Sequence, residues 1–379
     1  MLQKYDVIFT IRPASKVVGT IDYTFNPTNL NTYARIIMKD ILTSDSSGNF
    51  YPVGIKTVVI TYAESKDEAI EKAHVWAGGL ISLSSFTSNV GMPNIRAELA
   101  YETQDGKSER DFIQFFYEPP VPMPSSREIP FAVLGNIIEK LYVENNRYSD
   151  RVQRTIANYS KSLVEEHPID QFNALWLGFE ALNQPLKDAY SIPDQVEKCK
   201  MCGNERTVPS TNGIKAFLDA NFPEEPDLYS KARDVRVSIM HSTKNLYPIM
   251  PEVVKLIPKL RKGLRRAVFQ LLNLNVSDES GGEPIQNIFP VRTALEAKLV
   301  GASNVESLKV NGEEPQFILT NTEIQPHVEM DSKEVTFKIK TTRTAVINPP
   351  ASFQVYAHRI YGDPKKITGA KTDSIGPTK

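Results

Sequence analysis

The chain has 379 residues, which is long for one domain and predicts two or three. Its 44 Lys and Arg residues nearly balance 45 Asp and Glu residues, so no overall charge draws it to nucleic acid or to a membrane, and any basic surface is local. The N-terminal residues lack the apolar segment of a signal peptide, no run of about 18 apolar residues occurs, and two cysteines cannot form a disulfide framework. These features predict a globular cytoplasmic protein without membrane contacts.

Residues 1–117 are predicted to form an α+β domain. The segment 56–62, KTVVITY, is rich in β-branched residues and predicts a strand. Ser65 and Glu68 have the spacing of a capping box and predict the start of a helix. Two further strands are predicted, at 95–102 and 110–118. No catalytic motif occurs in this region.

A linker is predicted at 118–127, because residues 118–126 contain four prolines, which lack the amide donor that regular structure needs. The following region, 128–276, is predicted to be an all-α bundle. Its helices are expected at 129–146, 148–166, 169–184, 211–222, 226–243 and 250–274. Pro258 is expected to kink or restart the last of them.

The strongest helical period lies in the segment 169–184. Apolar residues recur there at a spacing of three and four, which predicts one buried stripe along a helix. The members of this stripe are Phe172, Leu175, Trp176, Phe179 and Leu182.

The C-terminal region, 285–365, is predicted to be a mostly-β domain. Its segments 333–347 and 352–362 read as strands, the first because apolar residues alternate along it. The last residues, 366–379, are predicted to be a loose tail.

A candidate catalytic pair lies near the end of the helix predicted at 226–243. Four residues separate Arg236 from His241, so on a helix they stand about 7.5 Å apart along the axis and about 140° apart around it. They cannot contact each other well, but both can border one groove, and Arg233 can flank the same cleft. The alternative is that His241 is a surface group or a partner of the helix C-terminus.

The context of this pair resembles the HEPN superfamily, whose hallmark is Arg-x4–6-His near the end of a helical bundle. The segments FNALWLGFEALNQ, KCKMCGNE and RVSIMH together look like HEPN proteins related to the methylamine-utilisation protein MauJ and to abortive-infection proteins. The resemblance covers roughly residues 130–275. It differs at one position: active members usually carry Asn, Asp or His directly after the arginine, whereas here Val237 follows Arg236, and Asp234 follows Arg233.

The resemblance implies a metal-independent endoribonuclease that acts as a homodimer. In such a reaction the 2′-hydroxyl attacks the adjacent phosphorus, which leaves a 2′,3′-cyclic phosphate and a 5′-hydroxyl. A base, an acid and a cation for the phosphate charge are needed; histidine can serve as base or acid, and arginine as the cation. One protomer offers a single such histidine, so the chemistry favours a two-fold dimer. No cofactor is required for it.

Proteins of this kind often belong to toxin, stress or anti-phage defence systems, which implies a partner protein from such a system. The alternative is a catalytically silent HEPN scaffold, or an adaptor that binds nucleotide or RNA, and Val237 favours it. A third hypothesis, from the MauJ resemblance, is an adaptor within a metabolic gene cluster. No P-loop, GxSxG elbow or HExxH is present, which argues against the enzymes that those motifs define.

Two further features bear on the site. Glu180 lies near the buried stripe and can orient Arg236 or Arg233, or form an ion pair that is only structural. The helix predicted at 250–274 carries basic residues on the side opposite its apolar stripe, which predicts an RNA-backbone track or an ordinary solvated face. Its candidate RNA-binding residues are Lys255, Lys259, Lys262, Arg265 and Arg266.

Cys199 and Cys202 have the C-x2-C-G form of half a zinc knuckle. Because structural zinc needs four ligands, two such motifs across a dimer can complete a site. A turn without metal and a reducible thiol pair are the alternatives.

Overall fold

The computed structural model describes the following residues: 2–13, 15–44, 48–92, 95–103, 112–114, 127–144, 147–194, 196–198, 201–202, 204–207, 210–240, 246–274, 282, 284–285, 292–300, 318–328, 335–345 and 352–361. The chain divides into two compact units, Met1–Asn287 and Ile288–Lys379. Residues 1–117 and 128–276, which the sequence suggests are two domains, both lie within the first unit. Most of the predicted linker, 118–126, and the predicted tail, 366–379, lie outside the described residues.

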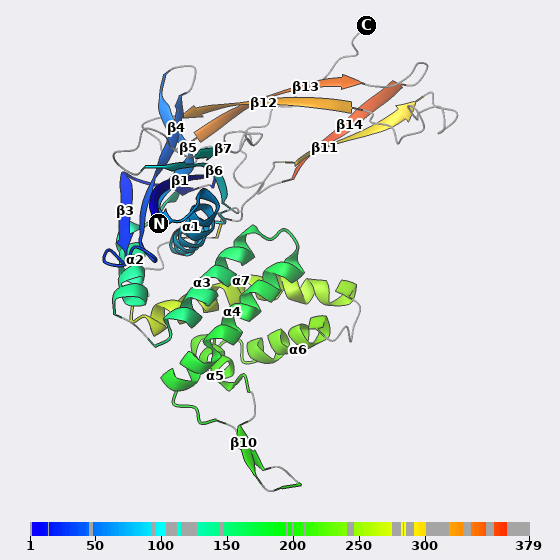
Figure 1. Cartoon of the computed structure of the whole chain (residues 1–379). Helices are drawn as coiled ribbons and strands as arrows, with labels where there is room; N and C mark the ends of the chain where they lie inside the picture. The colour runs from blue at the N-terminus through cyan, green and yellow to red at the C-terminus, as the bar shows by residue number, and fades with distance from the viewer. Residues whose placement is uncertain are drawn as a thin grey trace. The chain divides into compact units, whose positions relative to one another are not determined.

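The first unit begins with a six-stranded antiparallel sheet (Figure 1). Its strand order is β3-β4-β5-β1-β6-β7. The bounds are β1 Gln3–Ile11, β3 Thr20–Phe25, β4 Ala34–Ser44, β5 Phe50–Ala63, β6 Arg96–Glu102 and β7 Phe112–Gln114, while the short strands β2 Ser15–Lys16 and β8 Arg127–Glu128 pair separately and in parallel. The strands predicted at 56–62, 95–102 and 110–118 correspond to β5, β6 and β7. An antiparallel sheet with helices confirms the α+β character predicted for this part of the chain.

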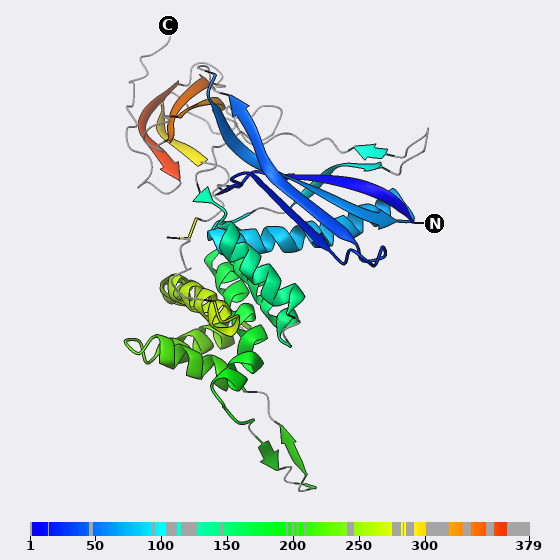
Figure 2. The ribbon, with the colours of Figure 1, turned by 90° about the vertical axis from the view of Figure 1, so that its left-hand side faces the viewer.

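One face of the sheet is covered by helix α1, Lys66–Ser88 (Figure 2). Along β1, alternate residues from Tyr5 to Ile11 are buried against it. Ala69, Ala73 and Ala77 lie one turn apart and are fully buried, so the helix can approach the strands closely. The predicted helix start is confirmed, because the Ser65 side chain accepts a hydrogen bond from the backbone N–H of Glu68 at 3.2 Å.

Residues 131–271 form a helical bundle beside α1 (Figures 1 and 2). Its elements are α2 Phe131–Ile138, the π-helix η1 Glu139–Val143, α3 Ser149–Val164, α4 Pro168–Ala189, α5 Asn212–Asn221, α6 Leu228–Met240 and α7 Leu246–Leu271. α4 lies at the centre of the bundle and packs against α3, α5 and α7. Its predicted stripe is confirmed, since all five members, from Phe172 to Leu182, are at most 2% exposed. Pro258 does not restart a helix: α7 runs through it without a break.

The sheet layer and the bundle meet at the end of α1, at a set of contacts that we call the α1 joint. Arg265 of α7 donates to the backbone carbonyls of Phe86 and Thr87. Asn89, which follows α1 in the left-handed conformation with φ 56°, accepts from the Tyr159 hydroxyl of α3 and donates to the Gly282 carbonyl. One hydrophobic core therefore continues from the sheet into the bundle.

A short hairpin interrupts the bundle between α4 and α5. Its strands, β9 Val196–Lys198 and β10 Glu205–Thr207, pair antiparallel and extend away from the helices (Figures 1 and 2).

The second unit is described by the backbone of four strands. β11 Arg292–Val300 pairs with β14 Ser352–Tyr361, and β12 Ile318–Val328 pairs with β13 Val335–Ala345, both antiparallel. The strands predicted at 333–347 and 352–362 correspond to β13 and β14. A mostly-β character for the whole region 285–365 stays a prediction, because the segments between these strands lie outside the described residues.

Candidate functional site

The structure places Arg236 and Glu180 together across the α4–α6 contact. Arg236 Nε lies 3.6 Å from the Glu180 carboxylate, and the two side chains are 16% and 38% exposed. Trp176, one turn earlier on α4, donates its indole N–H to the same carboxylate at 2.7 Å. Because Trp176 is itself buried, Glu180 is fixed on one side by the core and presents its charge to Arg236 on the other.

The Trp176 contact was not predicted from the sequence, which assigned this residue to the core stripe alone. The signal that could have revealed it is the spacing: Trp176 and Glu180 are four residues apart, and residues at that spacing are neighbours on a helix. Trp176 also packs against Tyr229 of α6, with 6.4 Å between the ring centroids. The two helices are thus joined beside Arg236 by an ion pair and by an aromatic contact.

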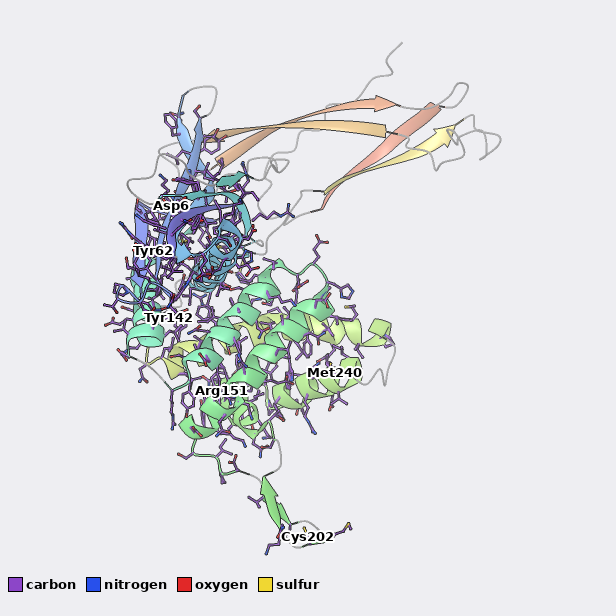
Figure 3. The ribbon with its side chains drawn as sticks, viewed as in Figure 1. Asp6, Tyr62, Tyr142, Arg151, Cys202 and Met240 are labelled. Carbon is purple, nitrogen blue, oxygen red and sulfur yellow. The ribbon has the colours of Figure 1, made fainter. Side chains whose placement is uncertain are left out.

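The other residues of the predicted motif lie along or just beyond α6. Arg233 and Asp234 are exposed on this helix, and Val237 is 42% exposed. α6 is described as far as Met240, and the next residue, His241, lies outside the described residues (Figure 3). The structure therefore brings Glu180 and Arg236 together and leaves the predicted position of His241 beside them untested.

The basic residues predicted on α7 do not form one exposed track. The prediction that Arg265 is an exposed RNA-binding residue is wrong. Its side chain is 4% exposed, and its guanidinium is occupied by carbonyls of α1 and by the rings of Phe86 and Phe269. Arg261, one turn earlier, is 5% exposed and donates to the Ser162 carbonyl at 3.0 Å. Burial lowers the pKa of Arg261 below its ordinary value. Both arginines bind the ends of neighbouring helices and do not face solvent.

The remaining members of the predicted track divide into two pairs. Lys259 forms an ion pair with Glu225, and Arg266 donates to the Asn221 carbonyl at 3.0 Å while its guanidinium stacks over the Phe222 ring. Lys255 and Lys262 are exposed. Only these last two keep the open, solvated position that the sequence predicted for all five.

The cysteine motif lies at the turn of the β9–β10 hairpin. Cys202 is a free, exposed cysteine at the far end of this hairpin (Figure 3), and Cys199 lies outside the described residues. Among the residues that the structure describes, no three His, Cys, Asp or Glu side chains gather as a metal site. A structural zinc shared between two chains therefore stays a prediction.

Comparison of the chain with protein-family profiles, with curated proteins and with solved structures found no match. Within the described part of the chain, no helix combines the length and the apolar character needed to cross a membrane.

Proposed function

We propose that this protein is a metal-independent endoribonuclease of the HEPN type that acts as a homodimer. The observation that carries the proposal is the support given to Arg236: an ion pair with Glu180, which is itself held by Trp176, at a position where the guanidinium stays partly exposed. Arginine is always charged and its fork geometry matches phosphate oxygens. A carboxylate at Nε leaves the two terminal nitrogens of the fork as donors to a phosphate.

The proposed reaction needs one proton transfer at each end of the scissile linkage. The 2′-oxygen attacks phosphorus and loses its proton to one histidine, and the 5′-oxygen leaves with a proton from another. His241 from each protomer would fill these two roles, with Arg236 binding the charge on the phosphate oxygens. We further propose a cytoplasmic role in a defence or stress system, with a partner protein that triggers the activity.

Cleavage in EDTA tests this proposal with the full chain. The substrates are tRNA, rRNA and mRNA pools, and the products are analysed for their end groups. We expect cyclic phosphate and 5′-hydroxyl ends from the wild type and none from Arg236→Ala or His241→Ala. Lys231→Ala is the matched control, because Lys231 is exposed on the same helix and its ammonium lies 4.0 Å from the Asp227 carboxylate, away from Glu180 and Arg236 in the sequence. Loss of activity in this control as well would contradict the assignment.

Variants of Glu180 separate its support of Arg236 from its support of the fold. Glu180→Gln keeps an oxygen that accepts from Trp176 but removes the charge that faces Arg236. We expect an unchanged melting temperature and a kcat lower by up to about 100-fold, because a small displacement of a catalytic group has an effect of that order. Unchanged kcat would show that the charge of Glu180 does not position Arg236 for catalysis. The molar mass in solution tests the dimer directly.

The second candidate is a catalytically silent scaffold that binds RNA or nucleotide. Val237 favours it, because this exposed apolar side chain stands where active proteins of the type carry a polar one. RNA binding without cleavage, in a preparation of intact dimer supplied with its genomic neighbours, would support this candidate over the nuclease.

A further inference from the structure

A row of basic residues follows the solvent face of α3. Arg151, Arg154 and Lys161 are exposed there, and Asn158 lies between them. Their spacing of three and four residues confines them to an arc of about 80° and spreads them over about 15 Å along the helix. The side chain of Arg147, two residues before α3, is 72% exposed and extends the row. We call these four basic residues the α3 basic face.

Within the described part of the chain, the two central charges of this face, on Arg151 and Arg154, form no ion pair. At its ends, Arg147 lies 3.0 Å from a carboxylate oxygen of Asp188, and Lys161 lies 3.8 Å from Glu165. Between them, neither arginine of α3 has an ion pair with any of the residues that the structure describes. Asp150 lies about 20° beyond the edge of this arc, and the four positive charges still outnumber the three nearby carboxylates, on Asp150, Glu165 and Asp188.

The α3 basic face meets the same turn of α4 as the candidate site. Arg151 Nη1 lies 3.4 Å from the Ala181 carbonyl oxygen and donates to it. The preceding residue, Glu180, lies 3.6 Å from Arg236. Adjacent residues of α4 thus contact the basic row from α3 and the candidate catalytic arginine from α6. Figure 3 labels Arg151 on the bundle and Met240 at the end of α6.

We propose that the α3 basic face, and not α7, binds the RNA backbone and guides it across α4 to Arg236. The proposal rests on the proposed function for its ligand, RNA. A row of exposed cations that leads to a site is how proteins hold a single strand without reading its sequence. On α7, by contrast, two of the six basic residues are buried and two are engaged by other groups, which leaves only Lys255 and Lys262 exposed.

Binding of an unreactive RNA tests the track without relying on cleavage. The probe is a fluorescent 2′-O-methyl oligonucleotide, which lacks the attacking hydroxyl, and its anisotropy is followed from 0.05 to 0.5 M salt with the full chain. Arg151→Gln/Arg154→Gln is compared with the matched pair Lys255→Gln/Lys262→Gln, which also removes two exposed charges from one helix. Melting temperatures confirm that each variant is folded.

We expect the α3 pair to lower the slope of log affinity against log salt by about 1.4, since each contact with single-stranded RNA contributes about 0.7. This corresponds to about 25-fold weaker binding at 0.1 M salt if the curves converge at 1 M. The α7 pair should leave both quantities unchanged. Equal losses from the two pairs, no loss from the α3 pair, or no binding by the wild type would each overturn the proposal. Binding that follows the expected pattern, with no cleavage of natural RNA even when the genomic neighbours are added, would support the track while refuting the nuclease.

Discussion

Replacing Arg265 by Met should markedly lower the melting temperature of the first unit. The substitution removes two hydrogen bonds from a charged donor and leaves the carbonyls of Phe86 and Thr87 buried without that donor. Each such bond contributes about 1.5 to 3 kcal/mol, and the contacts with the Phe86 and Phe269 rings add to this. A buried methionine avoids the desolvation cost of a buried charge, which offsets part of this lost stability. We therefore expect a net decrease of about 4 kcal/mol in the free energy of unfolding.

Thermal unfolding followed by circular dichroism measures this effect. A loss of about 4 kcal/mol lowers the melting temperature by roughly 8 to 16 °C in a domain of a few hundred residues. Lys262→Met, on the exposed side of the same helix, should change the stability by less than about 0.5 kcal/mol. An Arg265→Met protein that melts within about 2 °C of the wild type would refute the reasoning, since the α1 joint would then not depend on this residue.

Three further substitutions test other parts of the structure. Gly213→Ala would place a Cβ 2.3 Å from the backbone oxygen of Asn183, so we expect a loss of about 3 kcal/mol or more in urea unfolding. A Cβ at Gly79 would meet no described atom within 4 Å beyond its own stretch of helix, so Gly79→Ala should gain up to about 1 kcal/mol. Burial raises the pKa of Asp40, although its carboxylate accepts from the Val17 N–H at 2.7 Å. The Asp40 carboxyl group therefore holds a proton more tightly in the folded protein than in the unfolded chain. The free energy of unfolding should rise as the pH falls from the raised pKa towards 3.8. Asp40→Asn keeps the acceptor and should lack that rise; an identical pH profile would contradict it.

The helices and their buried faces were the most predictable part of the molecule. The stripe from Phe172 to Leu182 is buried because a period of 3.6 residues leaves few other arrangements for five large apolar side chains. The capping box was predicted in its main feature, the hydrogen bond that the Glu68 N–H donates to the Ser65 side chain. The Glu68 carboxylate, however, accepts from the N–H of Glu64, one residue before the expected donor.

The exposure of the basic residues on α7 was not predictable from charge alone. Arg261 lies four residues after Ile257, and Arg265 lies three before Val268, so both border the apolar stripe that the period defines. Their burial depends on which helices cover α7. That depends on contacts with α1 and α3, which are distant in the sequence. The pairing of Arg236 with Glu180 could not be predicted with certainty either, because the two residues are 56 positions apart in the chain.

Helix α1 packs against both the sheet and the helical bundle, and this limits how the molecule can be divided or recombined. Phe86 packs on Tyr159 of α3 and on Phe269 of α7, with ring centroids 5.0 and 5.4 Å apart, while the opening turns of the same helix cover the sheet. A fragment such as 128–276, excised along apparent domain limits, would expose these aromatic faces to water and would be prone to aggregate. The bundle is therefore not a transplantable module, and chimeras that exchange it between proteins would need to carry α1 with them.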